Sequence, residues 1–438
     1  MSSMRFDGSY HNAEVNIFDS IIRKHSIHDL AYYCSKVFTS GRNKRVYTDE
    51  YHGVPFLSNS DVSSADPFIS CKYTSQKYGF DQDGILKAGM ILTGRVGAIG
   101  QTAFVPRSWE AISAIGSDNI IRIQVKPEHK NGFLYAYLAS KVGNLSFWKH
   151  ATGGVQPFIT DKMVGGLPIP EFSEEFKETV DLLIQESARL RDESMTAINE
   201  AHSLIESHFL NVGQCNNKGL ISSRTILSAQ IHRFEAAYHL AAGKHYDEYI
   251  RQYFPWKSLG EISQSISRPG IAPRMYVKDG ITFMGGTDIF LSVPDSKKKL
   301  SRKAPNLNDY LIEEGWILLP RSGTIGDVVF TNEQHAQKLV SEHVIRIIPN
   351  NILRRGFVFS FLSSKIGRAL IQRPIFGSVI QHVEPPLLAV IPIPIFEEEE
   401  MKKIAELAEY HRECWGKAAK KELEAISLVE QEIEKWNS

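Results

Sequence analysis

The sequence predicts a mixed α/β (α+β) protein with two similar globular domains, each followed by one long helix. Two observations lead to this prediction. The 438 residues contain an ordered internal repeat, and each copy of the repeat ends in a charged stretch without proline. A chain of this length has room for two or three domains that each bury a core.

Five blocks of the first half recur in the same order in the second half. The pairs are RFDGSYH (5–11) with RFEAAYH (233–239), GVPFLSNSDV (53–62) with GITFMGGTDI (280–289), GMILTGRVGAIG (89–100) with GWILLPRSGTIG (315–326), GFLYAYLASKVG (132–143) with GFVFSFLSSKIG (356–367), and LPIPEF (167–172) with IPIPIF (391–396). The offset drifts only from 228 to 224 residues, which chance matches would not produce. The matched glycines, prolines and apolar residues are what a shared backbone needs, so the pattern indicates a duplication.

Each half ends in a stretch that predicts a long helix. Both stretches follow a proline, Pro170 or Pro394, begin with acidic residues and are rich in Glu, Lys, Ala and Leu. The chain therefore divides into domain, helix, domain and helix at residues 1–172, 173–212, 213–396 and 397–438. At about 1.5 Å per residue each helix would be roughly 55–60 Å long, which favours a spacer.

Apolar residues recur at spacings of three and four along both helices. The seams are Val180, Leu183, Leu190, Ala197, Ala201 and Leu204, and Ile404, Ala408, Trp415, Ala418, Ala425 and Val429. Such a stripe predicts a helix packed on something, and the duplication favours an antiparallel coiled coil of the two helices. Polar residues interrupt the seams at Ser187, Ser194, His411 and Glu422.

The segments before the helices predict short strands and helices. Runs such as GVPFL, MILTG, AFVP and IIRIQV stand between turn signals and predict strands. Residues 132–143 and 356–367 predict short helices. The glycine-rich GRVGAIG and SGTIG lack the order of a dinucleotide-binding loop and predict turns.

Composition excludes several classes of protein. Four scattered cysteines without a C-x-x-C pair exclude a disulfide framework and a zinc ribbon, and we expect no metal site. The sequence has no phosphate-binding loop, no zinc-protease motif and no serine-hydrolase elbow, which disfavours an enzyme. A polar N-terminus and the absence of an apolar run of about 18 residues predict a cytoplasmic protein without a membrane span.

The formal net charge is zero, with 50 basic and 50 acidic residues, which by itself argues against nucleic-acid binding. The sum hides a division along the chain. The two domain segments carry net charges of +3 and +8, and the two helical segments carry −6 and −5. The positive charge therefore lies on the domains, and the objection to nucleic acid falls away.

The matched glycine turns carry the first candidate contacts. Thr93 and Arg95 precede the turn in the first half, and Arg321, Ser322 and Thr324 stand at the equivalent place in the second. Backbone N–H groups of such a turn, with an adjacent arginine, suit a DNA phosphate or a guanine edge. The alternative is that both arginines are solvated or ion-paired scaffold residues.

Two further segments are candidates. The first is the loop Ser58, Asn59, Ser60 and Asp61, matched by Gly285, Gly286, Thr287 and Asp288, which could read bases or simply form turns. The second is the basic run Lys297, Lys298, Lys299, Arg302 and Lys303, which suits phosphates or forms a solvated face. The run has no evident counterpart in the first half.

Taken together, the repeated openings, the glycine turns, the glutamine-containing GGVQPF and GSVIQH and the IPIP-then-acidic-helix junctions resemble the specificity (S) subunit of type I restriction–modification systems. The resemblance covers essentially the whole chain. One departure is that members often carry P-L-P-x-x-E-Q at the junction, where PEFSEEF and PIFEEEE stand here.

The resemblance implies a non-catalytic subunit whose two target recognition domains each read one half of a bipartite double-stranded DNA site. The helices would be spacers on which two methyltransferase subunits dock. S-adenosylmethionine, ATP and Mg²⁺ would be bound by the methyltransferase and motor–nuclease subunits, and this chain would bind no cofactor. The alternative is a scaffold or decoy that binds methyltransferase subunits without reading DNA.

Overall fold

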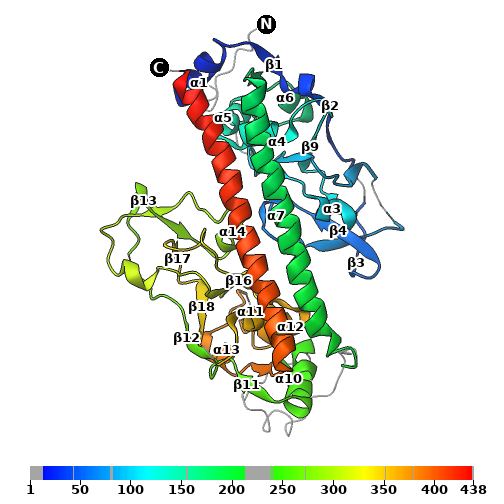
Figure 1. The fold of residues 1–438 in the computed structure, drawn as a ribbon, viewed down its shortest axis with the longest axis vertical. Helices are drawn as coiled ribbons and strands as arrows, with labels where there is room; N and C mark the ends of the chain where they lie inside the picture. The colour runs from blue at the N-terminus through cyan, green and yellow to red at the C-terminus, as the bar shows by residue number, and fades with distance from the viewer. Residues whose placement is uncertain are drawn as a thin grey trace. The chain divides into compact units, whose positions relative to one another are not determined.

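The computed structural model describes residues 13–42, 44–78, 82–153, 156–212, 238–239, 241–271, 273–350, 352–377 and 379–436. The chain forms two compact units: unit 1 is Met1–Asp192 with Lys417–Ser438, and unit 2 is Glu193–Gly416. The division falls within two long helices, α7 (Glu174–Ser207) and α14 (Glu398–Lys435) (Figure 1). Each unit therefore holds one domain and a part of both helices.

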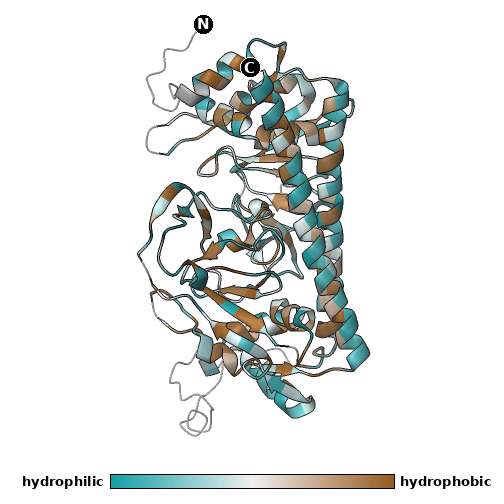
Figure 2. Cartoon of the chain, turned by 60° about the vertical axis from the view of Figure 1, so that its left-hand side comes forward, coloured by the Kyte–Doolittle hydropathy of each residue, from teal (hydrophilic) through white to brown (hydrophobic). Residues whose placement is uncertain are grey.

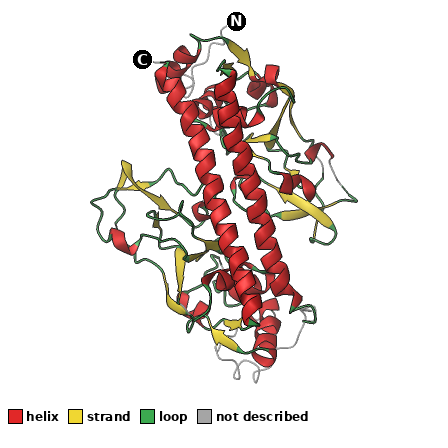
Figure 3. Cartoon of the chain, in the orientation of Figure 1, coloured by secondary structure: helices red, strands yellow, loops and turns green. Residues whose placement is uncertain are grey.

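Unit 1 consists of short strands and helices that precede α7. In chain order these are α1 (Ala13–Ile22), β1 (Ile27–Asp29), α2 (Leu30–Tyr33), β2 (Cys34–Thr39), β3 (Tyr47–Thr48), β4 (Gly53–Leu57), η1 (Asp61–Ser63), β5 (Lys72–Ser75), η2 (Gln82–Gly84), β6 (Ile91–Gly94), β7 (Thr102–Phe104), α3 (Arg107–Ala111), β8 (Ile115–Gly116), β9 (Ile120–Val125), α4 (Asn131–Ala139), α5 (Lys141–His150), α6 (Asp161–Gly165) and β10 (Pro168–Pro170). Figure 3 shows them by type.

The strands of unit 1 form two four-stranded sheets and a short pair. The first sheet has the order β2–β9–β6–β7 and is antiparallel, and the second has the order β3–β5–β4–β8, in which β4 and β8 pair in parallel. Strand β1 pairs with β10, which places Ile27 opposite Pro170. Since Ser173 Oγ then accepts a hydrogen bond from Phe176 N at 3.3 Å, α7 begins with a capped first turn directly after β10.

Unit 2 repeats this order of elements. They are α10 (Ala242–Tyr253), β11 (Trp256–Ser258), β12 (Ser263–Ser267), β13 (Tyr276–Met284), η3 (Asp288–Phe290), β14 (Lys299–Leu300), η4 (Leu307–Asp309), β15 (Ile317–Pro320), β16 (Val329–Phe330), β17 (Leu339–Val340), β18 (Val344–Pro349), α11 (Arg355–Ser363), α12 (Lys365–Gln372), α13 (Pro385–Ala389) and β19 (Pro392–Pro394). The sheets are β12–β18–β15–β16 and β14–β13–β17, with β13 and β17 parallel, and β11 pairs with β19. This repeated topology confirms the mixed α/β fold with two similar domains.

The predicted short helices are present, but each block holds two helices instead of one. In unit 1, Ser140 Oγ accepts from Gly143 N at 3.2 Å and begins α5 directly after α4. In unit 2, Ser364 Oγ accepts from Gly367 N at 3.3 Å in the same way. A Cβ at Gly143 would lie 2.3 Å from the carbonyl oxygen of Tyr137, so the sharp bend needs glycine.

Helix α7 contacts α14 in both units. In unit 1, Ser187 Oγ donates to Ala418 O at 2.8 Å. In unit 2, Ser194 Oγ lies 2.9 Å from His411 Nδ1, and Lys403 pairs with Glu200 at 2.7 Å. Because rising numbers in α7 meet falling numbers in α14, the pairing in unit 2 is antiparallel; the heptad packing of a coiled coil stays a prediction.

The predicted seams face the cores. Val180, Leu190, Ala197, Ile404, Ala408, Trp415, Ala418 and Ala425 are at most 7% exposed, and Leu183 and Leu204 are partly buried against the cores. The polar interruptions Ser187, Ser194 and Glu422 are also buried, and each has a hydrogen-bond partner. Figure 2 shows hydrophilic residues along both helices, as their acidic composition leads us to expect.

The proposed boundaries at residues 172, 212 and 396 stay predictions. The repeated opening 5–11 and most of 233–239 lie outside the described residues. Within the part of the chain that the structure describes, every helix is too short or too polar to cross a bilayer.

Three histidines of unit 2, the buried His335 and the half-buried His202 and His411, predict an acid-sensitive fold. Burial lowers the pKa of His335 and of His411 to about 4, and burial with the nearby positive groups lowers that of His202 to about 3. The His335 Nδ1 lies 3.2 Å from Asn332 N and 2.8 Å from Asn332 Oδ1, and its Nε2 lies 3.0 Å from Ile289 O.

We expect the free energy of unfolding to be constant above about pH 7 and to fall as the pH drops from about 6.5 toward 4. Over this range the unfolded chain binds protons that the folded chain excludes, which costs up to about 2 kcal/mol per histidine at pH 5. Denaturant titrations at pH 8, 6 and 5 measure this. Equal free energies of unfolding at pH 8 and 5 would contradict the prediction.

Candidate nucleic-acid interface

Three loops of unit 1 meet at one end of its sheets. They are residues 58–61 after β4, residues 95–98 after β6 and residues 117–119 before β9. Asn59 Nδ2 donates to Val96 O at 3.0 Å, and Ser117 N donates to Leu57 O at 2.8 Å. The structure thus brings together two of the loops that the sequence singled out and adds a third.

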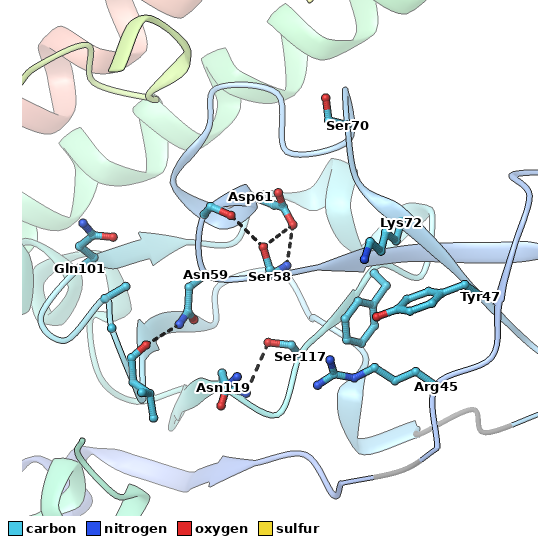
Figure 4. Close-up of a pocket in the computed structure, with 15 residues that line it drawn as sticks. Arg45, Tyr47, Ser58, Asn59, Asp61, Ser70, Lys72, Gln101, Ser117 and Asn119 are labelled. Carbon is cyan, nitrogen blue, oxygen red and sulfur yellow. Dashed lines mark hydrogen bonds between the residues drawn. The ribbon is translucent and has the colours of Figure 1, made fainter. Parts of the chain in front are cut away.

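These loops line a hollow of about 630 Å³ (Figure 4). Its other wall is formed by Arg45 from the segment before β3, Tyr47 from β3 and Lys72 from β5. The amides of Gln101 and Asn119 also line it. Hydroxyls, amides and cations of this kind bind phosphates and base edges.

The glycine turn beside the hollow has the expected form in both units. Gly97 and Gly323 have φ of +78° and +83°, and a Cβ at either would meet nothing within 4 Å. The prediction that these glycines form turns is confirmed. A turn tip without neighbours leaves its backbone open to a ligand.

Not every predicted residue of unit 1 is accessible. Thr93 lies in β6 and is 2% exposed, so the prediction that it contacts DNA is wrong, because the side chain points into the core. Asn59 ties two loops together, and its Oδ1 is buried, which makes it a positioning residue. Ser60 is exposed, and the half-buried Arg95 side chain has no ion-pair partner among the described residues.

Arg321 in unit 2 is not a free cation. Its Nη2 lies 2.6 Å from Glu384 Oε1, and Arg268 Nε lies 3.1 Å from Glu384 Oε2. Although burial alone would raise the pKa of Glu384, the hydrogen bonds from both arginines hold it below its usual value. The ion-paired scaffold role is therefore the one that the structure contains.

The remaining candidates of unit 2 are accessible. Thr287, Thr324, Lys297, Lys298, Arg302 and Lys303 are exposed, and Ser322 and Lys299 are half-buried. Phe283 N donates to Lys298 O at 2.8 Å, and in unit 1 Phe56 is opposite Lys72 at the same place in the sheet. The basic run therefore has one counterpart in the first half, contrary to the expectation from the sequence.

Sequence reasoning missed Arg45, Tyr47, Lys72 and Asn119 as residues of this interface. The signals were present as R-V-Y against R-M-Y at 45 and 274, and as S-D-N against S-E-H at 117 and 341. Three-residue matches of this kind are too short to stand out. Only the fold places the two triplets together.

A second hollow, of about 870 Å³, lies in unit 2 beside α14. Five carboxylates line it, from Glu314, Glu398, Glu406, Glu409 and Glu413. Two arginines also line it, and one of them, Arg355, donates to Glu409 at 2.8 Å. An excess of carboxylates repels phosphate, so the chemistry of this hollow does not suit DNA.

A comparison with protein families finds a match over part of the second half of the chain. Residues 256–425 match the type I restriction modification DNA specificity domain. No curated protein matches the chain.

Solved structures are similar over nearly the whole chain at low TM-scores. The S subunit of a type I restriction–modification system from M. genitalium is 11% identical, with a TM-score of 0.35, over 94% of this chain and 95% of that one. The HsdS subunit from Thermoanaerobacter tengcongensis is 14% identical, with a TM-score of 0.30, over 93% and 95%. A chain from a structure on complex assembly and conformational transition of a type I R-M system is 16% identical, with a TM-score of 0.30, over 93% and 97%.

Proposed function

We propose that the chain is a specificity subunit of a type I restriction–modification system and that units 1 and 2 each read one half of a split DNA site, since residues 256–425 match the type I restriction modification DNA specificity domain. One observation carries this proposal. In both units the arginine of the glycine turn donates its backbone N–H to a second loop, and the turn and this loop lie at the same end of the same sheet. Two such surfaces in one chain suit two half-sites of different sequence.

The helices α7 and α14 would separate the two surfaces and offer docking sites for two methyltransferase subunits. The acidic hollow beside α14 supports a protein partner at that place, since DNA is disfavoured there. Motor–nuclease subunits would join the assembly for restriction. In this proposal the whole complex is cytoplasmic.

The chain itself would be non-catalytic. The hollow of unit 1 is lined mainly by amides, hydroxyls, an ion-paired arginine and a lysine, and its one carboxylate, Asp61, accepts hydrogen bonds from Ser58 N and Oγ. Transfer of a methyl group from S-adenosylmethionine to N6 of adenine, and cleavage that uses ATP and Mg²⁺, would belong to the partner subunits.

Methylome sequencing tests the proposal. The chain is produced with its methyltransferase subunit in a host that lacks adenine methylation. We expect N6-methyladenine in one bipartite, asymmetric motif, and we expect that exchanging residues 1–172 for the matching domain of a relative changes one half of the motif only. Absence of any methylated motif would contradict DNA reading and favour the scaffold alternative.

A further inference from the structure

One wall of the hollow in unit 1 is a cluster of stacked and ion-paired side chains. Arg45 forms an ion pair with Asp118, and its Cζ lies 5.0 Å from the centroid of the Phe56 ring. The Tyr47 ring meets Phe56 edge-on, with centroids 6.1 Å apart. Lys72 Nζ lies 4.8 Å from the centroid of Tyr47, and Figure 4 shows Arg45, Tyr47 and Lys72 on one side of the hollow.

Unit 2 contains the same contacts among the arginine, the acid, the phenylalanine and the tyrosine. Arg274 forms an ion pair with Glu342, and its Cζ lies 5.3 Å from the centroid of Phe283. The Tyr276 ring meets Phe283 edge-on at 6.4 Å. Lys298 is exposed. Its carbonyl accepts from Phe283 N, so Lys298 lies opposite Phe283 as Lys72 lies opposite Phe56. The two units therefore share one frame of arginine, acid, phenylalanine, tyrosine and lysine.

Asn119 follows Asp118 in unit 1, and His343 follows Glu342 in unit 2. The two residues occupy the same position in this frame but have different side chains. Arg95 N donates to Asn119 O at 2.8 Å, and Arg321 N donates to His343 O at 2.7 Å. The side-chain amide of Asn119 lines the hollow and has no hydrogen-bond partner among the described residues of unit 1, whereas the backbone N–H of Asn119 donates to Ser117 Oγ. The His343 side chain is 50% exposed, and its Nε2 lies 3.6 Å from Glu342 Oε1.

We propose that Asn119 in unit 1 and His343 in unit 2 are specificity-determining residues that contact bases, while the lysine and tyrosine of the repeated frame hold the DNA backbone. This inference rests on the proposed function. Identical parts suit a backbone that is the same in every sequence, and the part that differs suits the bases. An asparagine amide pairs in two places with adenine, whereas a histidine presents one donor or one acceptor at each ring nitrogen.

Arg45 and Arg274 act as positioning residues in this scheme. Each is bound to a carboxylate and stacked on a phenylalanine, so that it fixes the tyrosine beside it and the loop that carries the acid. The charge for phosphates comes from Lys72 and Lys298. Tyrosine hydroxyls and lysines are common phosphate ligands.

The experiment compares variants of the chain in complex with its methyltransferase subunit, by methylome sequencing and by binding to duplexes with single base changes. We expect Asn119→Ala to relax the preference at one position of one half-site by roughly 5- to 150-fold, without effect on the other half-site. Asn119→His should change the preferred base at that position. His343→Asn should act in the same way on the other half-site.

Lys72→Ala should behave differently. We expect weaker binding to all duplexes by the same factor. The slope of the logarithm of the binding constant against the logarithm of the salt concentration should fall by about one, as for one lost phosphate contact. Asn16→Ala, on the exposed face of α1, serves as the matched control and should leave the motif unchanged.

The outcomes separate the inference from the proposed function. If the unaltered complex methylates no motif, the proposed function fails and the inference with it. If the complex methylates a split motif but Asn119→Ala and His343→Asn keep the same motif and rate, the inference alone is overturned. If Asn119→Ala changes the melting curve, the result for His343→Asn decides.

Discussion

Replacing Ala201 with proline is expected to break α7 near its C-terminal end and to lower the free energy of unfolding by about 3 kcal/mol or more. Ala201 is fully buried and belongs to the same core as Ile404 and Ala408 of α14. Proline would remove the N–H group that bonds to the carbonyl of Ala197, and its ring would clash with that carbonyl. Packing of α7 on α14 in unit 2 would be lost with it.

Denaturant unfolding of the full chain, followed by circular dichroism, measures this change. Glu174→Pro is the matched control, because proline at the first position of a helix lacks only an N–H group that has no partner there. The control should unfold at nearly the unaltered denaturant concentration. An Ala201→Pro chain with unchanged unfolding and unchanged binding of the methyltransferase subunit would show that α7 is not a continuous helix.

Arg122→Met is expected to destabilise unit 1 by about 3–5 kcal/mol and to abolish reading of its half-site. The Arg122 side chain is fully buried and donates to the carbonyls of Ile120 at 2.9 Å and Gly84 at 3.1 Å, as well as to that of Gly116. Methionine has a similar length but removes the guanidinium donor from these carbonyls. The loop at residues 117–119 would lose its support.

The measurement is again denaturant unfolding, combined with the methylome of the complex. Arg107→Met replaces an exposed arginine in the same unit and should change the free energy of unfolding by less than about 0.5 kcal/mol. Loss of one half of the motif with retention of the other would fit a defect confined to unit 1. Unfolding and methylation equal to the unaltered complex would contradict the role given to Arg122.

Features encoded by local pattern were predictable. Helix α7 lies within the stretch 173–212, and the seam residues Val180 and Ala197 are buried, because spacings of three and four place them on one face. The glycine turn at Gly97 followed from its position after an apolar strand. Repetition of both features made each prediction firmer than one copy could.

The accessibility of polar residues was not predictable. Thr93 alternates with apolar neighbours in a strand that is buried on both faces, so its hydroxyl is hidden. The sequence suggested that Arg321 contacts DNA. The structure instead pairs Arg321 with Glu384, which lies 63 residues further along the chain. Arg45 gained its role from Asp118, 73 residues away.

The sequence by itself determined the duplication, the two long helices and the match of residues 256–425 to a family of DNA specificity domains. Each depends on residues that are near one another in the chain or on a match that can be read letter by letter. Only the tertiary structure decided which arginines are held by carboxylates, which loops line the hollow and that Asn119 and His343 occupy one place in a repeated frame. These depend on contacts between residues far apart in sequence, because the interaction energy of a charge is set by the charges and the solvent around it.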